Sequence, residues 1–189
     1  PLRRGRVDLA GLAALVDART KLVFLANPNN PTGTYVGLRE LAVFLNRLPP
    51  ETLVVVDEAY ADFVDAQDYP HAIADLLPGH PRLVVLRTFS KAHGLAGLRV
   101  GYGVMAPALA AQLERVRPVF SLNALGAAAA RAALAETEHV ERSRRFVLRE
   151  RERLAEGFRR LGLTPLPSQA SFVCVRGLPA GTAAALEAE

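Results

Sequence analysis

The chain has 189 residues, half of them hydrophobic and 22% charged, and its net charge is +4. This composition is typical of one globular domain, or of one domain with part of another, and it excludes a disordered or collagen-like chain. The basic excess does not indicate a nucleic-acid partner, because the densest basic stretch, residues 141–160, mixes arginines with glutamates as a solvated helix does.

Several sequence features limit the kinds of protein and site that this chain can represent. Cys174 is the only cysteine, so no intramolecular disulfide forms and a cytoplasmic location is expected. No run of about 18 apolar residues is present to span a membrane, and no signal peptide opens the chain. The four histidines lack metal-ligand spacing, so we expect no metal site. Because the first residue is Pro1 rather than Met, we expect a piece of a longer chain.

The first half of the chain alternates helical and strand patterns. Asp8 is a candidate N-cap for the first helix. The apolar spacing predicts helices at residues 8–17, 38–48 and 71–77, and buried strands at residues 21–26, 52–57, 82–88 and 99–105. Continuous apolar strands that alternate with helices are typical of an α/β fold, so we predict a mostly parallel sheet with helices on both faces.

The second half begins with a long helical region and ends with short strand patterns. Helical spacing extends from residue 107 to Leu161, strand patterns return at residues 163–167 and 171–175, and the last residues look helical. A long helix that leads to new strands predicts a second, smaller α+β domain. We therefore divide the chain into part of a large domain at residues 1–137 and the start of a small domain at residues 138–189.

Two loops at the carboxyl ends of predicted strands carry candidate binding residues, because open parallel sheets bind ligands there. Residues 27–33, NPNNPTG, form a proline-rich turn that can fix an asparagine side chain, although these residue types are also common in plain loops. Asp57 ends an apolar strand, where its carboxylate needs a partner such as a protonated pyridine nitrogen. Tyr60 can reach the same ligand. A structural ion pair with an exposed tyrosine is the alternative.

A third loop combines groups for a phosphate with a lysine. Thr88, Ser90 and Arg99 supply two hydroxyls and a guanidinium, which together suit a phosphate. Lys91, at a partly buried strand end, is a candidate amine nucleophile for an aldehyde. The alternative is the phosphate-binding lysine of a nucleotide site, but the chain contains neither a Walker nor a Rossmann glycine pattern.

Together, the motifs NPNNPTG, DEAY and SKAHGLAGLR resemble those of the fold-type I pyridoxal-phosphate aminotransferases, and within that family most of all the histidinol-phosphate aminotransferases. The similarity covers essentially the whole chain, including PSQASF at residues 167–172. The resemblance implies that Lys91 carries pyridoxal phosphate as a Schiff base and that Asp57 pairs with its pyridine nitrogen. It also implies contacts from Asn30 and Tyr60 to the ring's phenolic oxygen, and from Ser90 and Arg99, with Thr88 as a weaker candidate, to the phosphate.

The resemblance further implies a cytoplasmic homodimer that transfers an amino group between histidinol phosphate and 2-oxoglutarate in histidine biosynthesis. A phosphate-amino-acid decarboxylase, an aromatic aminotransferase and the non-catalytic domain of a transcription regulator are the alternatives. The family's amino-terminal portion has no counterpart before Pro1, and its carboxylate-binding arginine would lie past Glu189. Ser171 stands where related sequences often have asparagine. We therefore expect this chain to be inactive or feeble by itself.

Overall fold

The structure is a computed structural model that describes residues 1–178 and 182. Its α-helices are α1 (Leu9–Ala14), α2 (Leu38–Arg47), α3 (Ala72–Asp75), α4 (Pro107–Val116), α5 (Ala124–Ala135) and α6 (Thr137–Arg160). Its strands are β1 (Leu2–Arg3), β2 (Arg6–Val7), β3 (Leu22–Ala26), β4 (Leu53–Asp57), β5 (Leu83–Thr88), β6 (Gly101–Met105), β7 (Thr164–Pro165) and β8 (Val175–Arg176). The short 3-10 helices are η1 (Ala61–Phe63), η2 (Leu77–Gly79) and η3 (Ala96–Leu98). In the described part of the chain, no helix is long and apolar enough to cross a membrane.

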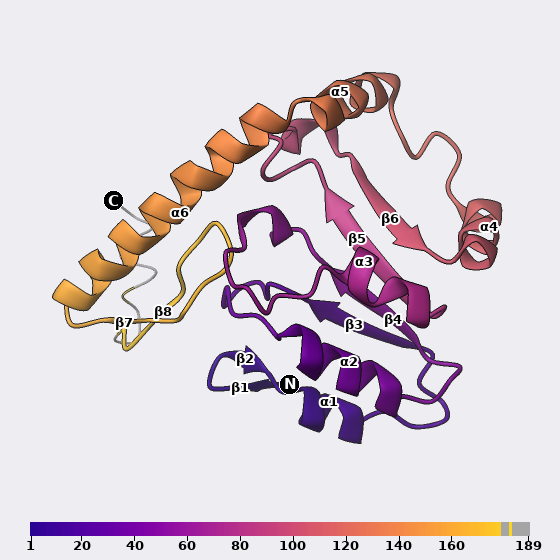
Figure 1. Ribbon diagram of the computed structural model, residues 1–189, viewed down its shortest axis with the longest axis horizontal. Coiled ribbons are helices and arrows are strands. Elements are labelled where there is room, and N and C mark those ends of the chain that lie inside the picture. Colours follow the sequence, from indigo (N-terminus) through magenta and orange to yellow (C-terminus); the bar gives the residue numbers. More distant parts are fainter. Residues whose placement is uncertain (179–181, 183–189) are drawn as a thin grey trace.

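A four-stranded sheet in the order β3-β4-β5-β6 forms the centre of the fold (Figure 1). Strands β3, β4 and β5 are parallel, and β6 runs antiparallel to β5. All four strands end where the sequence predicts, and each begins one or two residues later than predicted. The prediction of a mostly parallel α/β sheet is therefore confirmed.

One face of the sheet carries the main hydrophobic core. Neighbouring strands contribute side chains in register, and these are 5% exposed or less: Val23, Val54 and Leu83 in one row, and Leu25, Val56 and Val85 in the next. They pack against α2 through Leu41 and Phe44, and α1 and α3 cover the same cluster. Asp8 caps α1 as predicted, since its carboxylate accepts a hydrogen bond from the Gly11 amide at 2.9 Å.

The opposite face of β3 is open in the described part of the chain. Leu22 and Phe24 lie on it and are 50% and 70% exposed. The second layer of helices that the sequence predicts is therefore missing over this strand in residues 1–178. Elsewhere, α5 packs through Ala130 against Phe89 and Val100, beside the end of β5.

The predicted helical region from residue 107 to Leu161 is confirmed and consists of α4, α5 and α6. α6 runs along one side of the molecule toward β7 and β8 (Figure 1). Two arginines of α6 bind the residues that follow η1. Arg144 donates to the Val64 carbonyl at 3.1 Å, and Arg151 binds the Asp65 carboxylate at 2.8 Å. The domain boundary between residues 137 and 138 stays a prediction.

The predicted strand at residues 171–175 is wrong for most of its length, because only Val175 of that range belongs to a strand, β8. Backbone groups of the preceding PSQASF segment are bonded elsewhere. The Ser168 hydroxyl donates to the Phe172 carbonyl at 2.6 Å and accepts from the Ala170 amide at 3.1 Å. The Gln169 amide donates to the Gly33 carbonyl at 2.7 Å. One further bond, from the Leu166 amide to the Cys174 carbonyl at 2.7 Å, extends the β7–β8 pairing, and before residue 174 the bonds of Ser168 and Gln169 take the place of a strand ladder. The helix predicted for the last residues lies outside the described residues.

Candidate active site

The carboxyl ends of β3, β4 and β5 lie at one edge of the sheet. Ala26 pairs with Asp57 and Asp57 pairs with Leu86, so the three strands end almost level. The ladder continues past these ends, with the Asn27 amide donating to the Asp57 carbonyl and the Glu58 amide donating to the Leu86 carbonyl. The parallel strands therefore place the loops at residues 27–34, 57–60 and 88–99 together.

The first loop is fixed from beneath by Asn27, which is fully buried. Its side chain donates to the Val36 carbonyl at 3.1 Å and accepts from the Val36 amide at 2.9 Å, as a short piece of sheet would. Asn27 thus satisfies both backbone hydrogen-bonding groups of Val36, which fixes the two ends of the turn between Asn27 and Val36 relative to each other. Asn30 projects from this turn and is exposed.

Side chains from all three loops meet at Tyr60. Its phenol lies 3.2 Å from the Asn30 side-chain nitrogen, which donates to it. The amine of Lys91 lies 5.1 Å from the centroid of the Tyr60 ring. The ring itself is buried, at 8% exposure, and its edge contacts Phe172 at 5.2 Å between centroids. The structure thus brings together Asn30, Tyr60 and Lys91 from three separate strand ends.

The third loop groups the hydroxyls and the guanidinium as the sequence predicts. The Ser90 amide donates to the Thr88 hydroxyl at 3.1 Å, and Arg99 donates to the Ser90 hydroxyl at 3.4 Å. The same guanidinium donates to the Ala96 carbonyl at 2.8 Å. Arg99 adopts a left-handed backbone conformation with φ of 55° at the end of η3, which turns its side chain back toward Ser90. This cluster presents hydroxyl and guanidinium donors to an anion.

The environment of Asp57 differs from the one that the sequence suggests. Its carboxylate is exposed at the end of β4 and accepts a hydrogen bond from the Ala59 amide at 3.0 Å. No hydrogen bond or ion pair joins it to Lys91 or Tyr60 within residues 1–178. The argument that a buried carboxylate needs a partner is therefore wrong for Asp57. Lys91 is likewise exposed rather than partly buried.

The buried carboxylate is the next residue, Glu58, which sequence reasoning missed. Its side chain is fully buried and pairs with Arg87 at 2.7 Å, and Arg87 also lies 3.6 Å from the Asp62 carboxylate. Burial raises the pKa of the Glu58 carboxyl, and the Arg87 guanidinium opposes this shift. This ion pair joins the ends of β4 and β5 directly beneath the loops of the site. The available signal was the two adjacent acidic residues at a strand end, of which one must point inward.

Comparisons with known proteins identify the relatives of this chain. A model of the family described as aminotransferase class I and II matches residues 3–188. Histidinol-phosphate aminotransferase of Moorella thermoacetica is 49% identical over 93% of this chain and 45% of the relative. That of Anaeromyxobacter sp. is 50% identical over 90% of this chain and 46% of the relative. The chain thus spans about half the length of the curated relatives it matches.

The chain is also similar to solved structures. Histidinol-phosphate aminotransferase from Sinorhizobium meliloti, in complex with pyridoxal-5'-phosphate, has a TM-score of 0.89 and 36% identity, covering 98% of this chain and 50% of that one. L-threonine-O-3-phosphate decarboxylase from Porphyromonas gingivalis has a TM-score of 0.73 and 28% identity, covering 86% of this chain and 50% of that one. The family match over nearly the whole chain establishes that this chain belongs to the class I and II aminotransferases.

Proposed function

We propose that the protein containing this chain is a pyridoxal-phosphate-dependent aminotransferase that moves an amino group between histidinol phosphate and 2-oxoglutarate. The observation that carries the proposal is the meeting of Asn30, Tyr60 and Lys91 beside the cluster of Ser90 and Arg99. Identity of 49–50% to histidinol-phosphate aminotransferases supports the choice of substrate.

The donor set fits each functional group of pyridoxal phosphate. When bound, this cofactor supplies an aromatic ring that withdraws electrons from the substrate's α-carbon. The Lys91 amine would hold its aldehyde, and the Asn30 amide and Tyr60 phenol would bind its phenolic oxygen. The Ser90 hydroxyl and the Arg99 guanidinium would bind its phosphate, and Thr88, which accepts from the Ser90 amide, would orient that loop.

Two residues would carry the proton chemistry. Lys91, once displaced by the substrate amine, would take the proton from the substrate's α-carbon and deliver it to the cofactor. The exposed Asp57 carboxylate would face the ring nitrogen and keep it protonated. Because negative charge develops on the ring only during proton removal, Asp57 would stabilise the transition state more than the ground state.

We also propose that the full-length protein is a cytoplasmic homodimer. The segment from α4 to α5 exposes apolar side chains that are 75–96% accessible: Val116, Val119, Phe120 and Leu125. Large apolar side chains exposed to this extent within one segment are costly in water and support burial against another subunit. The single cysteine of the chain agrees with a reducing compartment.

The test uses the full-length protein loaded with pyridoxal phosphate. We expect glutamate to form from 2-oxoglutarate when histidinol phosphate is the amino donor. The likeness to L-threonine-O-3-phosphate decarboxylase makes release of carbon dioxide from threonine phosphate the matched alternative. Carbon dioxide release without glutamate formation would overturn the aminotransferase proposal and leave the cofactor proposal standing. Failure to bind pyridoxal phosphate would overturn both.

A further inference from the structure

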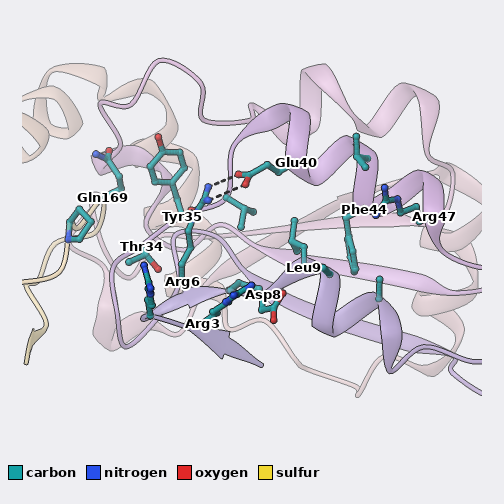
Figure 2. Close-up of a pocket in the computed structure, with 17 residues that line it drawn as sticks. Arg3, Arg6, Asp8, Leu9, Thr34, Tyr35, Glu40, Phe44, Arg47 and Gln169 are labelled. Atoms are coloured by element: carbon teal, nitrogen blue, oxygen red, sulfur yellow. Dashed lines mark hydrogen bonds and ion pairs between the residues drawn. The ribbon is translucent and has the colours of Figure 1, made fainter.

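A cavity of about 770 Å³ lies apart from the candidate active site (Figure 2). None of Asn30, Asp57, Tyr60 and Lys91 lines it. The β1–β2 hairpin and α1 form one wall, residues 34–36 and α2 form the other, and the PSQASF segment contributes Pro167 and Gln169. We call this space the arginine cavity, after its lining residues Arg3, Arg4, Arg6 and Arg47. Its volume is that of a typical small-molecule site.

The floor of the arginine cavity is apolar and mostly preformed. Phe44 and Val36 are each only 2% exposed, so their positions are fixed by the main core. Leu9 and Ala13 of α1 are partly buried against the same core, and Val43 of α2 is 44% exposed. An apolar ligand body that covers this floor removes surface from water without rearranging the core.

Two acidic residues line the cavity, and the fold uses both. Arg6 binds the Glu40 carboxylate through its two terminal guanidinium nitrogens, a contact drawn as dashed lines in Figure 2, and its Nε donates to the Tyr35 carbonyl at 2.7 Å. Asp8 caps α1 through the Gly11 amide at 2.9 Å. Arg6, Glu40 and Asp8 therefore already have hydrogen-bond partners within the chain.

The other three arginines of the lining have no such partner. In residues 1–178, no carboxylate lies within 4.0 Å of the guanidinium of Arg3, Arg4 or Arg47, whereas Arg6 is paired with Glu40. In the view of Figure 2, Leu9 and Phe44 lie between Arg3 at one end and Arg47 at the other. The cavity thus has guanidinium groups around an apolar floor.

The hairpin turn carries an arginine where backbone geometry favours a smaller residue. Arg4 and Gly5 connect β1 to β2 with φ of 54° and 84°, both in the left-handed region. Glycine or asparagine adopts this conformation at little cost, whereas another residue type is strained by about 1–3 kcal/mol. Arg4 occupies this position nonetheless, and it lines the cavity.

We propose that the arginine cavity binds a small amphipathic anion, namely a carboxylate on an aliphatic or aromatic body. Guanidinium groups bind carboxylates through paired hydrogen bonds, and the apolar floor accepts the body of the ligand. The site goes beyond the proposed amino transfer, because none of the residues that would hold the cofactor lines it, and Thr34 is the one lining residue that belongs to the loop at residues 27–34.

The test compares octanoate with its neutral counterpart octanamide by isothermal titration calorimetry on the full-length protein at low salt. Octanoate should bind one to one, and octanamide at least about tenfold more weakly, because the amide lacks the negative charge and the second acceptor oxygen that pair with a guanidinium. Equal affinity for the two compounds, or no binding of octanoate, would overturn the proposal.

Matched variants locate the binding. The triple variant Arg3→Gln/Arg4→Gln/Arg47→Gln should weaken octanoate binding at least about tenfold. The variant Arg39→Gln/Arg115→Gln/Arg131→Gln removes the same charge from exposed positions outside the cavity and should leave the affinity within about twofold. Val43→Glu places a carboxylate on the floor at a half-exposed helix position and should abolish binding while the fold is kept. Undiminished binding in the triple variant or in Val43→Glu would contradict the site.

Discussion

Asp57 and Glu58 are adjacent acidic residues with opposite environments. The Asp57 carboxylate is exposed at the edge of the sheet, whereas Glu58 is buried and paired with Arg87 at 2.7 Å. The two neighbours therefore differ in role: the Asp57 carboxylate is accessible to solvent, and Glu58 joins β4 to β5 through Arg87.

Changing Asp57 to asparagine should reduce turnover more than binding. The variant keeps the shape of the side chain but removes the charge that would keep the ring nitrogen protonated, so kcat should fall by about 10²–10³-fold. The affinity for pyridoxal phosphate, measured by absorbance titration, should change much less. An unchanged kcat in Asp57→Asn would contradict the role given to this residue.

Changing Arg87 to methionine should destabilise the fold in a way that depends on pH. Leaving the Glu58 carboxylate buried without its partner should cost about 3–5 kcal/mol in the free energy of unfolding. Burial raises the pKa of Glu58 in the folded state, so between its ordinary and raised values the folded chain binds more protons than the unfolded chain. Stability then falls as pH rises through this range, and loss of the opposing Arg87 charge widens the range.

Urea unfolding at several pH values between about 5 and 8 measures this effect. The gap in stability between the native protein and Arg87→Met should grow as the pH rises. The double variant Glu58→Gln/Arg87→Met carries no ionisable group at the pair and serves as the control, because its own stability should not vary with pH through titration at this site. A gap that is independent of pH in the single variant would show that Arg87 acts by packing alone.

At the scale of elements, the loop after β3 is held to a segment far along the chain. Gly33 has a φ of 74°, its carbonyl accepts from the Gln169 amide at 2.7 Å, and an added Cβ would lie 2.2 Å from the Ser168 hydroxyl. The loop that presents Asn30 is therefore fixed partly by PSQASF.

Changing Gly33 to alanine should destabilise the chain by roughly 1–3 kcal/mol, because alanine is strained at positive φ and its methyl group collides with Ser168. Gly79→Ala is the matched control, because no atom lies within 4 Å of the added methyl group there. Thermal unfolding followed by circular dichroism compares the two variants. Equal melting temperatures would mean that the loop is not held by this contact.

The sequence predicts the strands of the sheet well and the late strands poorly, for one physical reason. β3, β4 and β5 are continuous apolar runs that only a buried sheet can satisfy, and their ends match the prediction. The run at residues 171–175 is equally apolar, but its neighbours bond to Ser168 and to the loop at Gly33, which no local pattern reveals. The positions of the candidate site residues could be predicted from the ends of the strands. Their burial could not, as Asp57 and Glu58 show.

At the scale of the whole molecule, this chain holds a cluster of candidate cofactor residues on an open surface. Lys91 and Asp57 are exposed, and Phe24 on the free face of the sheet is 70% exposed. The chain spans about half the length of its curated relatives. We infer that the site functions in the full-length protein, where exclusion of water strengthens its charge interactions.

The proposed function depends on Lys91 carrying pyridoxal phosphate. Borohydride reduction of the full-length protein with the cofactor bound, followed by mass spectrometry of its peptides, tests this directly. The added pyridoxyl mass should appear on Lys91 and not on the other lysine of this chain, the exposed Lys21, and the label should be lost in Lys91→Ala. A label on a different lysine, or no label on the native protein, would contradict it.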